Sequence, residues 1–294
     1  MLVQWCHQEH LSQKGNDMNS IARFILIILI LAICIDRVLA ATNCVDPQGI
    51  DNSNRNGSTS QPWKTVTYAI GRSAPGDIIS LKAGATFIEK IFIGAINSGT
   101  SGHPLTIISD AANPAIIAAP TINDNAVSLY NAGHIRLQNL RFIGHGMDIH
   151  QTDGASLYTD DTGHDSISLI NCEFSGFGKT GLVIGGFNGE VGGFRHVRVD
   201  RCVFRDNRRD GASTYAAHPA ANQDFVFSNC RAYNNLGDPD YTASHSGSGI
   251  IMGSVTGGRI EYCVAYNNGA RCSTTGGPVG LWAYNSTNVI IQYC

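Results

Sequence analysis

Short apolar segments recur at nearly constant spacing along the chain. Each alternates β-branched or aromatic residues with polar ones, which predicts strands, and Gly, Asn, Asp and Ser fill the gaps. Cysteines mark the repeat, at intervals of 30, 28, 33 and 31 residues. They are Cys172, Cys202, Cys230, Cys263 and Cys294. A period of about 30 residues built from strands predicts an all-β solenoid, and the most economical form is a parallel β-helix whose coils stack on one another.

The cysteine spacing favours a ladder of reduced thiols. Equivalent positions in successive coils lie about 4.8 Å apart, and Leu140 takes the same place one coil earlier. Cysteine therefore serves as a small buried hydrophobe, with one or two disulfides as the alternative. Cys44 and Cys272 fall outside the ladder, so they are the candidates for a disulfide or for free thiols.

One strand aligns across six coils by internal similarity. Alternation places one set of its side chains in the core and the other outside. The segments are 126–130, 154–158, 181–185, 211–215, 249–253 and 280–284. The outward set includes Tyr130, Tyr158, Tyr215, Tyr284 and Trp282. Such rings offer sugars an apolar face with polar tips, and Trp282 is the strongest candidate contact. The alternative is that the tyrosines stack on each other and stabilise neighbouring coils.

The N-terminal region predicts export and a cap. Residues 18–40 resemble a secretory signal peptide, whereas residues 1–17 lack signal character and are interpreted as an over-extended start. The apolar run is short for a bilayer span, so we expect a secreted, extracellular or periplasmic protein with no stable membrane anchor. The β-helix domain is predicted over residues 42–294. Helical spacing over residues 62–70 predicts a short helix that covers the first coil, and the segment at 78–81 is the expected first strand.

Composition narrows the class of partner. The net charge is −3, only 15% of residues are charged, and like charges form no block, so we expect no nucleic-acid partner. The 33 glycines suit a turn-rich β-fold, and a monomer is expected. Because the sequence ends on the ladder position Cys294, we also expect C-terminal coils to be missing.

The segment after Cys44 resembles the opening of secreted right-handed parallel β-helix proteins of the pectate-lyase-like superfamily. The resemblance rests on DPQGIDNSNRNGSTSQPWKTVTYA, PGDIISL and SGTSGHPLTIIS. Polysaccharide lyases of family 9 have such openings, and GGPVGLWAYNSTNVIIQYC is similar to their coils. The resemblance implies a right-handed β-helix and a carbohydrate-active role, without specifying an activity.

The densest charged cluster is RDNRRDG, residues 205–211, directly before one copy of the aligned strand. Neighbouring coils place Lys179 near Arg209, and with Arg208 these form a cationic rim beside the aromatic side chains. Such a rim would bind an acidic polysaccharide. The alternative is a solvated turn in which Asn207 and Gly211 set the bend.

β-Elimination follows from a cationic rim, because a lyase must neutralise a uronate carboxylate and remove the C5 proton. In family 9 lyases a lysine acts beside a calcium ion held by several aspartates. The resemblance implies Lys179 as the base, with Arg209 as its alternative or as the neutralising group. Asp206, Asp210 and Asp153 are the implied Ca²⁺ ligands. However, Asp153 and Asp210 sit two coils apart, about 10 Å, whereas the family groups its aspartates tightly.

Two other function classes stay open. One is a non-catalytic carbohydrate-binding or adhesive β-helix, and the other is a glycoside hydrolase or epimerase on the same fold. Gly144-His145-Gly146 and Asp160-Asp161 are similar to polygalacturonase motifs, but in reversed order. The histidines show no metal-ligand spacing and are expected at the surface: His150, His164, His218 and His245. The longest loop contains Asp238, Asp240 and His245 and is a candidate wall of a groove.

Overall fold

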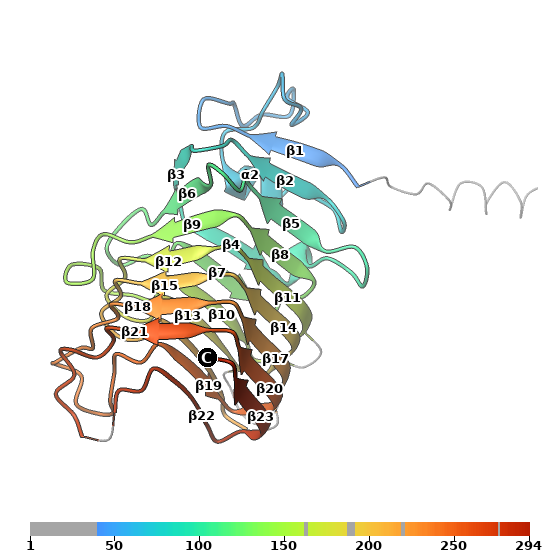
Figure 1. Ribbon diagram of the computed structural model, residues 1–294. Coiled ribbons are helices and arrows are strands. Elements are labelled where there is room, and N and C mark those ends of the chain that lie inside the picture. Colours follow the sequence, from blue (N-terminus) through green and yellow to red (C-terminus); the bar gives the residue numbers. More distant parts are fainter. Residues whose placement is uncertain (1–39, 162–163, 187–191, 219–220, 276) are drawn as a thin grey trace, which may run out of the picture. The chain divides into compact units, whose positions relative to one another are not determined.

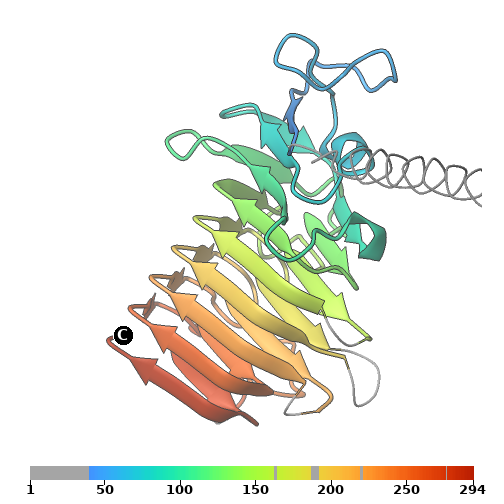
Figure 2. The same ribbon diagram turned by 90° about the vertical axis from the view of Figure 1, so that its right-hand side faces the viewer.

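The computed structural model describes residues 40–161, 164–186, 192–218, 221–275 and 277–294. The predicted over-extended start, and the predicted signal peptide apart from Ala40, lie outside the described residues. From Ala40 onward the chain forms one compact unit in which strands stack coil upon coil (Figures 1 and 2).

Each full coil has three strands, and equivalent strands of successive coils pair in parallel, which confirms the predicted parallel β-helix. The β1 sheet contains β1 (Thr42–Val45), β2 (Ile78–Leu81), β5 (Leu105–Ile108), β8 (Ile135–Gln138), β11 (His164–Ile170), β14 (Phe194–Asp200), β17 (Asn222–Ser228), β20 (Val255–Glu261) and β23 (Thr287–Gln292). The β3 sheet contains β3 (Thr86–Ile88), β6 (Ala115–Ala118), β9 (Leu140–Ile143), β12 (Glu173–Ser175), β15 (Val203–Arg205), β18 (Arg231–Tyr233) and β21 (Val264–Tyr266). The β4 sheet contains β4 (Ile91–Gly94), β7 (Val127–Tyr130), β10 (Ala155–Thr159), β13 (Leu182–Gly186), β16 (Ala212–Ala216), β19 (Ile250–Gly253) and β22 (Leu281–Tyr284).

The N-terminal end differs from the prediction in one respect. The segment expected to be the first strand is β2, because β1 precedes it and pairs with it from Thr42↔Ile78 to Val45↔Leu81. The helix α2 (Val66–Ile70) confirms the predicted cap: it buries Val66, Ala69 and Ile70. Trp63 is buried too, but as a bridge partner of Val45 outside the helix.

The thiol ladder is confirmed. The register Glu173↔Arg141 places Cys172 beside Leu140, as expected from the repeat. Four ladder cysteines are buried and free, whereas Cys294, on the last described coil, is exposed. Each Sγ donates to a backbone carbonyl of the preceding coil, as from Cys202 to Leu169 at 3.5 Å. Cys44 and Cys272 are free thiols as well.

A single residue in the left-handed region precedes each ladder position. The φ angles are 56° at Asn139, 51° at Asn171 and 55° at Asn229, and Arg201, Tyr262 and Tyr293 take the same conformation. Because asparagine tolerates this conformation better than most residues, it recurs before the ladder. This one-residue turn directs the chain from the β1 sheet into the β3 sheet.

Within the described residues, no helix has the length and apolar character needed to cross a membrane.

Candidate functional site

The aligned strand of the sequence repeats is the β4 sheet. Neighbouring strands of this sheet pair in parallel at Val127↔Ala155, Ala155↔Leu182, Leu182↔Ala212, Ala212↔Ile250 and Ile250↔Leu281. These core-side residues are buried in the first five coils, and Leu281 is half-buried. The alternation therefore assigned the two faces correctly.

The repeated glycine before this strand reflects close contact between coils. A Cβ at Gly211 would lie 2.4 Å from the carbonyl oxygen of Gly249, and one at Gly249 would lie 2.3 Å from that of Gly280. Any larger residue would force the coils apart, so the strand start is held rigidly.

The residue before each glycine bonds to the next coil. Oδ1 of Asp153 accepts a hydrogen bond of 2.9 Å from the backbone N–H of Thr180. Oδ1 of Asp210 accepts one of 2.7 Å from the backbone N–H of Ser248. These bonds hold both carboxyl groups at the edge of the β4 sheet, two coils apart, so their backbones are separated by about 10 Å.

A buried asparagine stack supports the charged loop 205–211. Nδ2 of Asn207 donates to Oδ1 of Asn235 at 3.0 Å, and Nδ2 of Asn235 donates to Oδ1 of Asn268 at 3.0 Å. Asn207 and Asn235 are fully buried. Asn207 is thus a structural residue, whereas Arg209 and Asp210, just after it, are only partly buried.

A cavity of about 450 Å³ lies over β13, β16, β19 and β22. Its charged residues are Asp153, Arg209 and Asp210. Its aromatic and imidazole rings are Tyr215, Tyr241, His245, Trp282 and Tyr284. The loop between β18 and β19 supplies Tyr241, Ser244 and His245, and Figure 1 shows the long loops at this end of the coils in orange and red.

Both carboxyl groups have raised pKa values although each keeps some access to solvent. Burial raises the pKa of Asp153, and this shift is only partly offset by the Thr180 N–H and by the charges of Lys179 and Arg209. Burial also raises the pKa of Asp210 to about 6, with a further contribution from the negative charge of Asp153. Asp210 therefore changes its protonation state near neutral pH, as general acids and bases do.

Arg209 is held at the cavity wall by two contacts. Its Nε donates to Oδ2 of Asp238 at 3.2 Å, and its guanidinium carbon lies 4.0 Å from the ring centre of Tyr241. Asp238 also accepts a hydrogen bond of 2.9 Å from Nε of Arg208, and its side chain is only 10% exposed. Burial alone would raise the pKa of Asp238, but the hydrogen bonds from the two arginines lower it overall.

Another part of the cavity wall is aromatic. The ring centres of His245 and Trp282 lie 5.0 Å apart, and those of Trp282 and Tyr284 lie 5.2 Å apart. Nδ1 of His245 and Nε1 of Trp282 are buried and have no hydrogen-bond partner among the described residues. A Cβ at Gly277 would come within 2.5 Å of Cγ of His245, so the loop backbone packs directly on the imidazole.

The predicted tyrosines divide into two groups. Tyr215 and Tyr284 line the cavity and lie over glycines of the preceding coil, since a Cβ would meet Tyr215 at Gly185 and Tyr284 at Gly253. Tyr130 and Tyr158 lie outside the cavity, with ring centres 4.8 Å apart. The hydroxyl of Tyr130 donates to Asp160 at 2.5 Å. For this second pair the structural alternative, stacking between coils, matches the contacts better.

Three other predicted residues do not line the cavity. Lys179 lies one coil from Arg209, whose N–H donates to the Lys179 carbonyl at 3.1 Å. Arg208 lies beside the cavity and pairs with Asp238 and Asp240. Asp206 pairs with Arg205 and accepts a bond of 3.2 Å from Asn234, on the other side of Asn207.

The expected calcium ligands therefore do not form one set. Asp153 and Asp210 share the cavity without Asp206, because Asn207 turns inward between Asp206 and Asp210. Over the residues that the structure describes, no three His, Cys, Asp or Glu side chains are grouped to hold a metal ion. The residues present do not fit the calcium site that the sequence suggested.

One histidine contradicts the prediction of surface positions, and two others are only partly exposed. His150 is buried, with Nε2 3.0 Å from Oγ1 of Thr152, and burial lowers its pKa. His164 and His245 are half-buried, each with one buried ring nitrogen, and His245 lies in the cavity wall. Tyr241 was missed as a site residue, and His245 was expected only as part of the long loop that was a candidate groove wall; the length of this loop was the only sequence signal for either residue.

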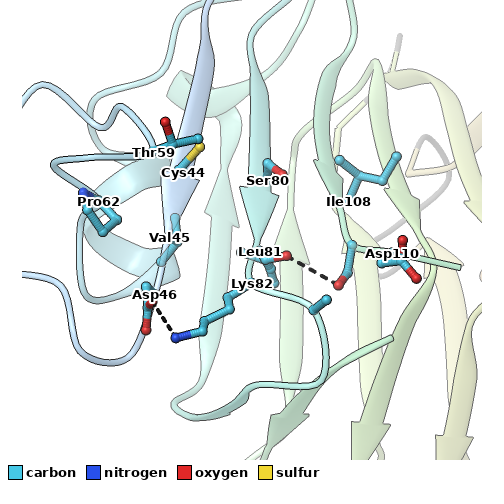
Figure 3. Close-up of a pocket in the computed structure, with 12 residues that line it drawn as sticks. Cys44, Val45, Asp46, Thr59, Pro62, Ser80, Leu81, Lys82, Ile108 and Asp110 are labelled. Atoms are coloured by element: carbon cyan, nitrogen blue, oxygen red, sulfur yellow. Dashed lines mark hydrogen bonds and ion pairs between the residues drawn. The ribbon is translucent and has the colours of Figure 1, made fainter. Parts of the chain in front are cut away.

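A second pocket of about 510 Å³ lies near the N-terminal cap, against β1 and β2 (Figure 3). Its lining includes Cys44, Asp46 and Lys82, and the last two form an ion pair of 2.7 Å. None of its lining residues is aromatic, and its lysine is already paired. The cavity over the β4 sheet is therefore the better candidate for function.

Comparisons with solved structures identify the same fold. A pectate lyase, Pel9A, aligns with a TM-score of 0.53 and 18% identity, over 78% of this chain and 64% of the lyase. A GH136 lacto-N-biosidase from Eubacterium ramulus aligns with a TM-score of 0.58 and 14% identity, over 96% of this chain and 60% of that one. A rhamnogalacturonan lyase aligns with a TM-score of 0.51 and 15% identity, over 84% and 62%. This chain thus spans about three fifths of the length of each.

No curated protein matches the sequence. A family model described as the Pel9A-like, right-handed β-helix region matches residues 44–281, which is most of the chain. The match covers the thiol ladder from Cys172 to Cys263 and the strands that form the cavity. The chain belongs to the Pel9A-like right-handed β-helix family.

Proposed function

We propose that this chain binds an acidic polysaccharide in the cavity over the β4 sheet and cleaves it by β-elimination. One observation carries the proposal: Arg209 and Asp210, adjacent in sequence, both line one cavity that also has aromatic walls. The pairing offers a fixed cation for a uronate carboxylate next to a group that can take a proton.

Arg209 suits the neutralising role. Its Nε is used by Asp238, while Nη1 and Nη2 make no hydrogen bond with a described residue. Two parallel N–H groups match a carboxylate, and a guanidinium stays protonated. Neutralising the uronate carboxylate makes its C5 hydrogen more acidic.

Asp210 suits the role of base better than Lys179, which lies outside the cavity. Above pH 6 or so it is mostly ionised. Its carboxylate takes the C5 proton, the C5–H electrons form the C4–C5 double bond, and the C4–O bond breaks. The departing oxygen takes a proton from water. No step depends on a metal ion.

A second candidate is inverting glycoside hydrolysis. It is suggested by the presence of two carboxyl groups, Asp153 and Asp210, in one cavity, since inverting enzymes use one carboxyl group as acid and another as base. Both raised pKa values suit such a pair. Here a water molecule, activated by one carboxylate, attacks the anomeric carbon while the other protonates the leaving oxygen.

The products separate these activities. Purified protein is incubated with polygalacturonate, and both ultraviolet absorbance of an unsaturated uronate and new reducing ends are measured. A lyase produces both signals, a hydrolase produces only reducing ends, and a binding protein produces neither. We expect Arg209→Ala to abolish both signals and Arg201→Ala, at an exposed ion pair outside the cavity, to retain them.

Export and a monomeric state complete the proposal. A polysaccharide substrate is met outside the cell, which agrees with the predicted signal peptide. Size-exclusion chromatography of secreted protein, with N-terminal sequencing of the product, tests both.

A further inference from the structure

Charge is distributed unevenly across the cavity over the β4 sheet. Its one cationic side chain, Arg209, lies at the wall formed with Tyr241 and Asp238. The other wall consists of His245, Trp282, Tyr284 and the aliphatic Ile251. Neither a lysine nor an arginine stands at that aromatic wall among the described lining residues.

Asp210 contributes negative charge near the aromatic wall. Asp210 is close enough to raise the pKa of Tyr284, after the larger effect of burial. Asp153 acts in the same way on Tyr215. The aromatic wall itself offers a uronate carboxylate no lysine or arginine, whereas Asp210 contributes negative charge there, so an uncharged sugar is favoured.

The aromatic wall also has unused hydrogen-bonding capacity. Nε1 of Trp282 is a donor, and Nδ1 of His245 accepts in one neutral tautomer. Neither atom has a hydrogen-bond partner among the described residues, and an unsatisfied buried polar atom is destabilising. Two neighbouring hydroxyl groups supply what is missing, because one accepts from the indole N–H and the other donates to the imidazole.

We propose that His245 and Trp282 form a subsite for an uncharged sugar residue, adjacent to the uronate held by Arg209. This subsite rests on the proposed function and defines its substrate as a polysaccharide in which a neutral sugar neighbours a uronate. Because both nitrogens are buried, binding at this subsite requires the His245 ring to turn away from Trp282. The sugar then stacks on the indole.

Binding of three glycans tests the subsite. The probes are oligosaccharides of polygalacturonate, of a rhamnogalacturonan backbone, and of β-1,4-galactan, which are fully acidic, alternating and neutral. Affinities are measured by calorimetry and by tryptophan fluorescence. We expect the alternating probe to bind wild type tightest and to change the fluorescence of Trp282.

Conservative variants isolate the two nitrogens. Trp282→Phe and His245→Phe keep a ring but remove the nitrogen, and each should weaken binding of the alternating probe about five- to tenfold, as expected for one lost hydrogen bond. Binding of polygalacturonate should stay within about twofold. Tyr266→Phe, at an exposed tyrosine stack on the β3 sheet, is the control.

Two results overturn the subsite alone: unchanged affinity for the alternating probe in both variants, or an equal loss for polygalacturonate. The proposed function would survive either result, since wild type would still bind and cleave. If wild type neither binds nor cleaves any of the three glycans, the proposed function and the subsite both fail. Circular dichroism of each variant confirms that it is folded.

Discussion

Oδ1 of Asp210 accepts a hydrogen bond of 2.7 Å from the backbone N–H of Ser248, its counterpart one coil further on. The carboxyl group that we assign as the base is therefore also a contact between coils. Asp153 makes the same contact with Thr180. Substitutions at either position must keep this acceptor if loss of chemistry is to be separated from loss of structure.

Asp210→Asn keeps the acceptor and removes the charge. The folded-state pKa of about 6 lies above the ordinary aspartate pKa of 3.8, so protonation stabilises the folded state, and this contribution is lost as pH rises through that window. The stability of the variant relative to wild type should therefore increase between pH of about 4 and about 7, by up to about 3 kcal/mol. Thermal unfolding of both proteins across this range measures the difference.

The same variant should lose activity at every pH. If the difference in stability between Asp210→Asn and wild type does not change with pH, Asp210 has an ordinary pKa. Its assignment as the base then loses this support. Asp206→Asn, at a carboxylate outside the cavity, is the matched control for activity.

Asp153→Asn separates the two candidate activities. Inverting hydrolysis needs both carboxyl groups, so the rate should fall at least about a hundredfold. In β-elimination Asp153 acts only through its charge, which raises the pKa of Asp210, so the rate should fall less than about tenfold. Initial rates on polygalacturonate, with unsaturated product and reducing ends followed in parallel, give the answer. Full retention of reducing-end release without unsaturated product would contradict both assignments.

Asp238→Asn should affect the site without unfolding the coils. The variant weakens the ionic contacts to Arg208 and Arg209 and leaves two arginines without their buried partner, so we expect a loss of about 2–4 kcal/mol in unfolding free energy. Because Arg209 is then free to move, kcat should fall at least about tenfold. Steady-state kinetics and denaturant unfolding are compared with Asp240→Asn, whose side chain is 84% exposed. Wild-type kcat in Asp238→Asn would show that Asp238 does not position Arg209.

The thiol ladder predicts a graded cost. Cys202→Ala removes a fully buried sulfur and leaves a small void, so it should destabilise by about 1–2 kcal/mol. Cys294→Ala, at the exposed end of the same ladder, should change stability by less than about 0.5 kcal/mol. Urea unfolding measures both. If Cys202→Ala changes the unfolding free energy as little as Cys294→Ala is expected to, the buried ladder does not contribute through packing.

The fold could be predicted because its determinants are local and repeat. Two-residue alternation assigned the faces of the β4 sheet. The spacing of the cysteines from Cys172 to Cys263 assigned the register of successive coils, with Leu140 at the equivalent position one coil before Cys172. Trp282, Tyr284, Arg209 and Asp210 could be placed together on one strip for the same reason. The early strand β1 was missed because its four residues, TNCV, carry only weak alternation.

The site itself could be predicted only in part. Asp206 and Asp210 are four residues apart, yet the inward turn of Asn207 puts only one of them in the cavity. His245 and Tyr241 come from a loop whose path is set by the ion pairs of Asp238 with Arg208 and Arg209, about thirty residues away in sequence. Such contacts leave no periodic pattern in the sequence, so they could not be predicted from it.

The sequence by itself therefore determined the architecture, the period of the repeat and the outward aromatic face, because each depends on the short-range pattern repeated in successive coils. Only the tertiary structure decided which charged groups share the cavity, how far burial raises the pKa of Asp210, and which loop closes the aromatic wall. Those properties depend on desolvation and on pairing between coils, where residues distant in sequence meet.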